Sequence, residues 1–210
     1  MQVKICGMKY ADNVVSIASL QPDFMGFIFY DKSKRFVGEL EISILQQIPQ
    51  HINKVAVFVN ETIDKIKAIV TKYELNYIQL HGNETVDFCE KLKEINIPII
   101  KAFNISDDFD FTILEKYQKS CSYFLFDTFS KNYGGSGKTF NWKILEQYQL
   151  TTKIFLSGGI GLENIHLALS IQHPQLFALD INSKAEVFPA LKNISYTNNI
   201  IKIIKEHESI

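Results

Sequence analysis

The chain has 210 residues, of which 46% are hydrophobic and 21% are charged, and its formal net charge is −1. This is the balance of a soluble globular protein with one core, and the near-neutral charge excludes a general attraction to nucleic acid or to an anionic membrane. The longest apolar runs fall far short of the roughly 20 residues that cross a bilayer. We therefore predict one domain over residues 1–210, without nucleic-acid or membrane partners.

The start of the chain and its cysteines indicate a cellular compartment. Residues 2–6 have the pattern of a strand and lack the apolar region of a signal peptide. The three cysteines, Cys6, Cys89 and Cys121, are an odd number without C-x-x-C spacing, which favours neither a disulfide framework nor a zinc site. Cys89 and Cys121 fit packing positions. We expect a cytoplasmic protein with reduced cysteines and no metal site.

Short apolar runs alternate with amphipathic segments along the whole chain, which is typical of a parallel α/β sheet. The predicted strands are 2–6, 23–29, 53–59, 76–80, 97–102, 121–127, 153–157 and 177–181. The predicted helices lie near 10–19, 40–48, 61–71, 84–95, 108–118, 141–148, 162–171 and 195–207. Eight such units fit a closed (βα)8 TIM barrel better than an open doubly wound sheet, which usually has five or six strands.

Polar residues suggest where several of these helices begin. Asn60 is placed to cap the helix at 61–71, whose Ile63, Ile66, Ile69 and Val70 share one face. Residues 83–84 and 106–108 resemble two further helix starts.

A barrel carries its active site at the carboxyl ends of its strands, and polar side chains gather at these positions. Side chains alternate along a strand, so Lys4 and Cys6 share a face, as do Gln79 and His81. The candidates at the strand ends are Cys6, Arg35, Asn60, His81, Asp127, Ser157, Gly158, Gly159, Asp180, Asn182 and Ser183.

Cys6 and Asp127 are the candidates for catalysis, although each has a simpler interpretation. Most buried cysteines only fill space, but Cys6 stands at a strand end before Gly7, so a base or nucleophile is equally compatible. Asp127 follows four apolar residues and either caps the next loop or acts as an acid. The glycine-rich loop 128–139 behind it favours the catalytic role, because such loops often act as lids. Residues 137–139 resemble the end of a P-loop, but Asn132 stands where that motif requires glycine.

Two loops are candidates for binding a phosphate. Gly158 and Gly159 follow the seventh strand, where barrels often hold phosphate on backbone N–H groups. Ser183 and Lys184 follow the eighth strand, and residues 184–187 are compatible with the short extra helix of such sites. Arg35 lies in a charged loop that is either solvated or able to clamp a carboxylate. His81 is either a base or a structural histidine.

Taken together, these segments resemble the phosphoribosylanthranilate isomerase family of tryptophan biosynthesis. The resemblance extends over nearly the whole chain, and its specificity comes from the order and spacing of all the segments. They are residues 4–7, 26–30, 33–35, 57–60, 79–82, 127–128, 133–140 and 156–159.

The resemblance implies a (βα)8 barrel without cofactor or metal that catalyses an Amadori rearrangement of N-(5-phosphoribosyl)anthranilate. It implies that Asp127 protonates the furanose ring oxygen and that Cys6 then removes the C2 proton. Arg35 would hold the anthranilate carboxylate, and the phosphate would lie on the loops after strands seven and eight. The partner is thus a phosphorylated small molecule, and the protein is expected to be a monomer or a homodimer.

This chemistry needs a thiolate at Cys6 while Asp127 is protonated, the reverse of their ordinary pKa values of roughly 8.5 and 3.9. At pH 7 that state costs about 2 kcal/mol for the thiol and about 4 kcal/mol for the acid. A cation such as Lys4 is expected to lower the pKa of the thiol. Lys4 itself needs a carboxylate partner, with Asp180 and Asp127 as the candidates.

The chain departs from the family pattern in the eighth unit. Lys184 and Ala190 stand where the family usually has glycine, and Asn141 stands where it commonly has a helix-capping aspartate. A lysine at 184 still offers a backbone N–H to phosphate unless that position requires a positive φ. Two other functions stay open: an isomerase that also accepts a histidine-pathway substrate, against which Cys6 argues, and a ligand-binding barrel without activity.

Overall fold

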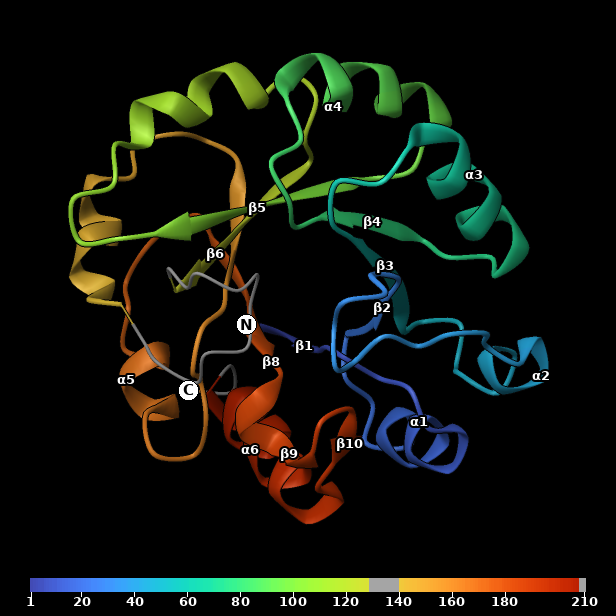
Figure 1. Ribbon diagram of the computed structural model, residues 1–210. Coiled ribbons are helices and arrows are strands. Elements are labelled where there is room, and N and C mark those ends of the chain that lie inside the picture. Colours follow the sequence, from blue (N-terminus) through green and yellow to red (C-terminus); the bar gives the residue numbers. More distant parts are fainter. Residues whose placement is uncertain (129–139, 208–210) are drawn as a thin grey trace.

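The computed structural model describes residues 1–128 and 140–207, and its eight parallel strands close into a barrel in which each strand pairs with the next and β8 pairs with β1 (Figure 1). The predicted (βα)8 fold is confirmed, and every predicted strand coincides with an observed one to within a few residues. The strands are β1 Gln2–Ile5, β2 Phe24–Ile28, β3 Asn53–Phe58, β4 Tyr77–Leu80, β5 Ile99–Ile105, β6 Tyr123–Thr128, β7 Lys153–Leu156 and β8 Leu176–Ile181.

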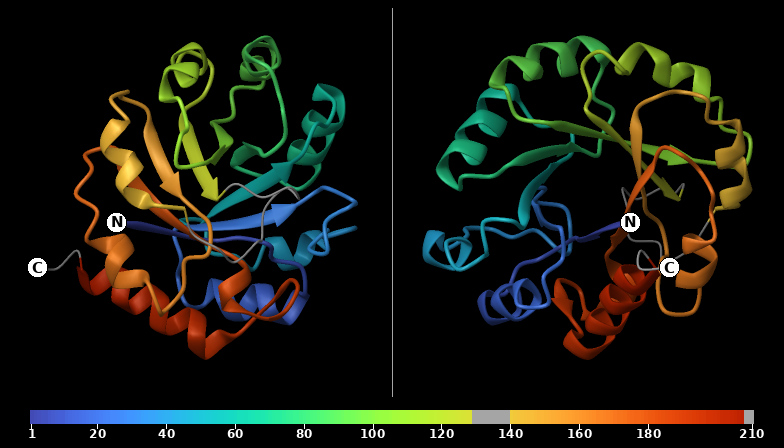
Figure 2. Two further views of the ribbon diagram at one scale, coloured as in Figure 1. Left: turned by 60° about the vertical axis from the view of Figure 1, so that its left-hand side comes forward. Right: turned by 180° about the vertical axis from the view of Figure 1, so that it is seen from behind.

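The helices surround the barrel, and all except the last are shorter than the sequence predicts (Figures 1 and 2). The α-helices are α1 Ala11–Ala18, α2 Ile42–Leu45, α3 Ile63–Lys72, α4 Val86–Leu92, α5 Ile165–Leu169 and α6 Ile194–His207. The segments after β5 and β6 form 3₁₀ helices, Phe111–Tyr117 and Trp142–Gln147, and a further 3₁₀ turn, Lys93–Ile95, follows α4. Hydrophobic periodicity predicts which face is buried, but it does not distinguish a full α-helix from a short 3₁₀ segment.

Three of the predicted helix starts are wrong by a few residues. Asn60 does not cap α3: its φ is +50°, and its side chain accepts a hydrogen bond from the Asn83 backbone at 2.7 Å. The caps are instead Thr62, Thr85 and Asp110, whose side chains accept from backbone N–H groups two or three residues further on. These residues stand immediately before the first turn, where a short oxygen-bearing side chain can reach those groups.

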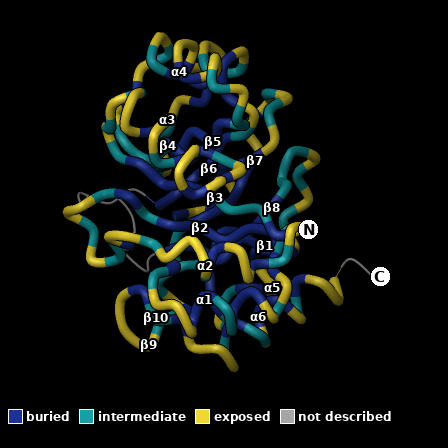
Figure 3. Tube along the Cα trace, turned by 90° about the vertical axis from the view of Figure 1, so that its right-hand side faces the viewer, coloured by how far each residue is buried: buried dark blue, intermediate teal, exposed yellow. Residues whose placement is uncertain are grey.

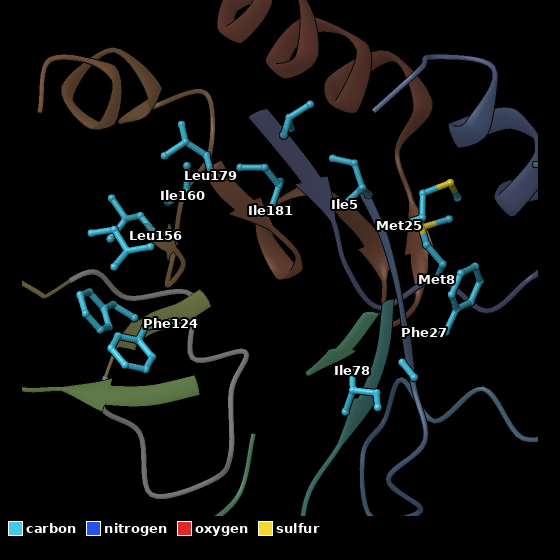
Figure 4. Packing of buried hydrophobic residues seen from close by; sticks show 14 of the residues in the cluster. Ile5, Met8, Met25, Phe27, Ile78, Phe124, Leu156, Ile160, Leu179 and Ile181 are labelled. Carbon is cyan, nitrogen blue, oxygen red and sulfur yellow. The ribbon is translucent and has the colours of Figure 1, made fainter. Parts of the chain in front are cut away.

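Alternation along the strands divides the core into two clusters. Residues such as Ile5, Phe27 and Leu179 point outward and pack beneath the helices, as Figure 4 shows. Residues such as Phe24, Val57 and Phe155 point into the barrel and fill its interior. The strands are therefore buried on both faces, whereas the exposed residues lie mainly on the surrounding helices and loops (Figure 3).

The segment after β8 differs from its prediction. Residues 184–187 do not form one helix: a 3₁₀ turn, Ser183–Ala185, leads directly into a small antiparallel hairpin of β9 Glu186–Phe188 and β10 Leu191–Lys192. Helix α6 then packs against α1, α5 and β1, so the last described helix lies beside the first strand and the first helix (Figure 1). None of the helices in the described ranges is long and apolar enough to cross a membrane.

Candidate active site

A pocket opens at the carboxyl ends of the strands, where the barrel fold predicts the active site. Its lining draws on the ends of β1, β4, β6, β7 and β8 and on the loop after β2. The residues predicted for catalysis and substrate binding line this one pocket: Cys6, Arg35, His81, Asp127, Gly158, Gly159, Asp180, Ser183 and Lys184. Of the other candidates at the strand ends, Ser157 and Asn182 also line it, whereas Asn60 does not.

Cys6 lies at the end of β1 with its thiol in the barrel interior, 3% exposed. The facing residue on β2 is Gly26, and a Cβ atom there would lie 2.7 Å from the Cys6 sulfur. Only the absence of a side chain at Gly26 leaves room for the thiol in this position. The backbone N–H of Cys6 donates to Ile181 of β8 at 2.9 Å, which fixes the end of β1.

Lys4 and Asp180 form an ion pair directly beneath Cys6. They are register partners on β1 and β8, and Lys4 Nζ lies 2.9 Å from Asp180 Oδ1. Both side chains are almost completely buried. Burial on its own lowers the pKa of Lys4, but the negative charge of Asp180 raises it above its ordinary value, so the ammonium stays protonated. Of the two partners predicted for Lys4, the structure selects Asp180.

Asp127 lies near the carboxyl end of β6 and lines the same pocket as Cys6. Its Oδ1 accepts a hydrogen bond from the Thr128 backbone at 2.9 Å, and its Oδ2 lies 3.4 Å from Nε2 of His81. The amide nitrogen of Gln79 donates to Nδ1 of His81 at 2.8 Å. Because Nδ1 accepts that bond, the ring proton of a neutral His81 lies on Nε2, which faces the carboxyl group of Asp127.

The thiol of Cys6 does not have the low pKa that the sequence led us to expect. Burial raises its pKa above the ordinary value; the Lys4 ammonium and, more weakly, Lys192 lower it, whereas Asp180 raises it. The expected effect of Lys4 is therefore present, but it is smaller than the desolvation of the thiol. At neutral pH Cys6 is mainly protonated in the substrate-free site.

The loops after β7 and β8 present backbone N–H groups to the pocket. Gly158 and Gly159 have φ angles of +92° and +63°, and a Cβ atom on Gly158 would lie 2.8 Å from the Thr128 backbone nitrogen. Among the described residues, the N–H groups of Gly158, Gly159, Ser183 and Lys184 have no hydrogen-bond acceptor. All four residues line the same pocket, and backbone N–H groups that lack an acceptor are suited to binding an anion.

A family model for N-(5'-phosphoribosyl)anthranilate (PRA) isomerase matches residues 3–203 of the chain. The chain belongs to the PRA isomerase family. N-(5'-phosphoribosyl)anthranilate isomerases of Parabacteroides distasonis and Phocaeicola vulgatus are 41% and 39% identical to it. The first alignment covers 97% of this chain and 93% of the relative, and the second covers 98% of each.

Solved PRA isomerases share the fold. The enzyme of Thermotoga maritima superposes with a TM-score of 0.85 at 34% identity, covering 98% of this chain and 99% of that one. A PRA isomerase solved in complex with reduced 1-(o-carboxyphenylamino)-1-deoxyribulose 5-phosphate has a TM-score of 0.80 at 31% identity, with 98% and 99% coverage. The resemblance inferred from the sequence is thus confirmed, and the chain is an isomerase of tryptophan biosynthesis.

The departures from the PRA isomerase pattern have different structural consequences. Lys184 does not have a positive φ, so the position accepts a side chain, and its ammonium pairs with Glu163 at 2.5 Å. Ala190 does have one, +71°, which a glycine would adopt without strain. Asn141 caps its 3₁₀ helix by accepting from the Lys143 backbone at 3.2 Å, as an aspartate would.

Sequence reasoning missed two residues that hold Arg35. The guanidinium of Arg35 makes a bidentate pair with Glu186 on β9, and Glu186 also accepts from Lys192 on β10. A signal for them exists in the sequence of this chain, because Glu186 and Lys192 both follow the last barrel strand. The predicted lid, residues 128–139, falls outside the described residues apart from Thr128.

Among the described residues, no group of three or more His, Cys, Asp or Glu side chains is arranged to hold a metal ion. The pocket lining includes one thiol, the carboxylates of Asp127 and Asp180, the cations of Arg35 and Lys184 and the imidazole of His81. Such a set can transfer protons, and its N–H groups and arginine can bind an anionic substrate.

Proposed function

We propose that the chain converts N-(5'-phosphoribosyl)anthranilate to 1-(2-carboxyphenylamino)-1-deoxyribulose 5-phosphate, with Asp127 as the general acid and Cys6 as the general base. The observation that carries this assignment is the placement of a thiol and a carboxyl group in one pocket, on β1 and β6, with a buried cation beside the thiol. The family to which the chain belongs supports the substrate.

The first step opens the sugar ring. Asp127 gives its proton to the furanose oxygen, the bond from that oxygen to C1 breaks, and the anilinic nitrogen supplies the electron pair that forms a protonated Schiff base. The proton on Nε2 of His81 faces Oδ2 of Asp127, so the imidazole can stabilise the carboxylate that this step leaves behind.

The second step moves the double bond. Cys6 takes the proton from C2, which the adjacent iminium has made acidic, and the electrons of the C–H bond form an enamine that tautomerises to the ketone. Burial disfavours the charged thiolate of Cys6. The ammonium of Lys4, which pairs with Asp180, offsets part of this cost. Asp180 therefore acts on the reaction through Lys4.

The substrate phosphate fits the N–H groups of Gly158, Gly159, Ser183 and Lys184 described above. Arg35, which lines the same pocket, suits the anthranilate carboxylate, which both substrate and product carry. We thus assign two anion-binding positions and the proton-transfer groups to one pocket. We further propose a single domain over residues 1–210 and a cytoplasmic location, as the reduced cysteines suggest.

One assay tests this function. The purified chain is incubated with N-(5'-phosphoribosyl)anthranilate and, separately, with the aminoaldose phosphate of histidine biosynthesis. We expect turnover of the first compound alone, because the anthranilate carboxylate is the group that Arg35 recognises. Turnover of both would indicate the bifunctional isomerase, and product binding without any turnover would indicate a barrel that has lost its activity.

A further inference from the structure

Arg35, the residue assigned to the substrate carboxylate, already pairs with a carboxylate of the protein. Its Nε lies 2.8 Å from Oε1 of Glu186 and its Nη2 lies 2.7 Å from Oε2. The pair is well shielded, with the arginine side chain 15% exposed and that of Glu186 5% exposed. An intramolecular partner in this position either blocks the arginine or holds it in place.

The donors that Glu186 leaves unused decide between these two possibilities. A guanidinium has five N–H groups, and the pair with Glu186 uses the one on Nε and one on Nη2, which form one edge of the plane. One N–H on Nη1 and the second on Nη2 form the other edge, and the last N–H on Nη1 points back toward Cδ. Among the described residues, no acceptor contacts that second edge, and Arg35 lines the pocket together with Cys6 and His81. A second carboxylate can therefore bind Arg35 without displacing Glu186.

The charge of the group also suits an anion. Lys192 is fully buried, and its ammonium donates to Oε1 of Glu186 at 2.9 Å and to the carbonyl and side-chain oxygens of Asn182 at 3.1 and 2.8 Å. Burial lowers the pKa of Lys192 and the Glu186 carboxylate raises it, and its three acceptors are all satisfied only by the protonated ammonium, so we assign Lys192 as a cation. Burial on its own raises the pKa of Glu186, but Arg35 and Lys192 bring it below the ordinary value, so Glu186 is an anion. Two cations and one anion leave one positive charge for a ligand.

The backbone around this group is shaped for it at two points. Gly7 has a φ of +76°, and a Cβ atom there would lie 2.9 Å from Cδ of Arg35 and 2.7 Å from Oδ1 of Asn182. Ala190 adopts a φ of +71° despite its side chain, and its N–H donates to Oε1 of Glu186 at 3.0 Å. The loops after β1, β2 and β8 thus converge on one ion pair.

We propose that Glu186, held in turn by Lys192, is the positioning residue that fixes the guanidinium of Arg35 with its free edge toward the substrate carboxylate. This inference rests on the proposed function, since it assigns a role at the same site. A fixed plane loses less freedom on binding than a mobile arginine, and it accepts only a carboxylate that lies in that plane. Glu186 contributes to affinity for the anthranilate end without touching the substrate.

Two inhibitors separate positioning from general damage to the site. One is the reaction product; the other is 1-phenylamino-1-deoxyribulose 5-phosphate, which has the same sugar phosphate but no carboxylate. For Glu186→Gln we expect the inhibition constant of the product to rise about tenfold, which is the size of effect that loss of one charge-assisted hydrogen bond produces. The inhibition constant of the second compound should stay unchanged. In the Arg35→Ala background, Glu186→Gln should have no further effect on product binding. Glu61→Gln, which breaks an ion pair with Lys65 outside the pocket, is the control.

If the single variant unfolds, the double variant Glu186→Gln with Lys192→Met replaces it in the same measurements. It removes both charges, so no uncompensated charge stays buried. The proposal is overturned if Glu186→Gln weakens both inhibitors equally, or neither. It is also overturned if the effects of Arg35→Ala and Glu186→Gln are additive. A failure of the proposed function is distinct, because it shows in the wild-type chain, as an absence of turnover, whatever the variants do to product binding.

Discussion

Two of the buried lysine–carboxylate pairs at the top of this barrel, Lys4–Asp180 and Lys101–Glu84, differ in what surrounds them. Lys4 and Asp180 meet inside the barrel at 2.9 Å, and Lys101 and Glu84 meet in its wall at 3.0 Å. All four side chains are at most 4% exposed. Lys101 stands between Ile100 and Ala102, which face the interior, so it points outward, toward the helices.

The outer pair is saturated by the backbone. Lys101 also donates to the carbonyl groups of Gly82 and Ala102 at 2.8 and 3.0 Å, and Glu84 accepts from the N–H groups of Asn60 and Gly82. Each charge has its hydrogen-bonding capacity filled by the chain itself. This pair ties the loops after β3 and β4 together and has no capacity left for a ligand.

The inner pair has capacity to spare. Among the described residues, Lys4 interacts with the side chains of Asp180 and Cys6 and with no backbone group, and Asp180 lines the pocket. An unsaturated buried charge is costly to maintain, and here it lies beside the proposed base. In these two pairs, saturation by the backbone, rather than burial, distinguishes the structural ion pair from the one beside the proposed base.

The largest effect is expected on replacing Cys6, the proposed base beside the inner pair. We expect Cys6→Ser to fold and to lower turnover by several orders of magnitude, because a serine hydroxyl is far too weak a base at neutral pH. Cys121→Ser, at a buried cysteine outside the pocket, is the matched control and should keep normal turnover per folded molecule. A Cys6→Ser enzyme with more than about a tenth of wild-type turnover would exclude Cys6 as the base.

Asp127→Asn removes the proton donor and should lower kcat by a similar factor, because an amide has no acidic proton to give to the ring oxygen. KM should change little if the group acts chiefly in the transition state. Steady-state kinetics with the purified variant provide both constants. A loss that falls entirely on KM would make Asp127 a binding residue.

Removing the inner pair should lower activity less than replacing Cys6 or Asp127. Lys4→Met combined with Asp180→Asn removes both charges without leaving one unpaired, and Asp180→Asn alone is the control. Loss of the ammonium raises the pKa of Cys6 further, and each unit costs about a factor of ten in thiolate. Because the active form needs a thiolate together with a protonated acid, kcat/KM should fall about tenfold at neutral pH. Its alkaline limb, which follows the thiol, should move to higher pH. A limb that stays in place would separate Lys4 from the ionisation of Cys6.

The outer pair should show the opposite result. Lys101→Met leaves the Glu84 carboxylate buried without its cation, which should cost about 3–5 kcal/mol of stability. Denaturant unfolding measures this loss, and kcat/KM per folded molecule should be unchanged. A variant that keeps its stability but loses activity would reverse the distinction between the two pairs.

Most of the fold and the membership of the site could be predicted from the sequence. The strands follow from short apolar runs at regular spacing, and a barrel brings their carboxyl ends together, so Cys6, His81, Asp127 and Asp180 were predictable as neighbours. Helix types were not, because an amphipathic period does not reveal where an α-helix gives way to a 3₁₀ turn.

The parts that sequence reasoning missed depend on contacts between distant segments. Gly26 is needed because the thiol of Cys6 lies against it, and Glu186 matters because its carboxylate reaches Arg35, 151 residues earlier in the chain. The predicted direction of the Cys6 pKa shift was also wrong, because the structure raises this pKa and the sequence led us to expect a lower one. Lys4 is visible in the sequence as a nearby cation, whereas the extent of burial that outweighs it is a property of the closed barrel.

The division of labour between Asp127 and Cys6 is the central claim, and a kinetic isotope effect tests it most directly. Turnover is measured with substrate carrying deuterium at C2, for the wild type, Cys6→Ser and Asp127→Asn. If Cys6 removes the C2 proton, Cys6→Ser makes that step limiting and its residual kcat shows a large primary isotope effect. Asp127→Asn makes the earlier ring opening limiting, so its isotope effect is close to unity. The reverse pattern, or equal isotope effects in the two variants, would contradict the assignment.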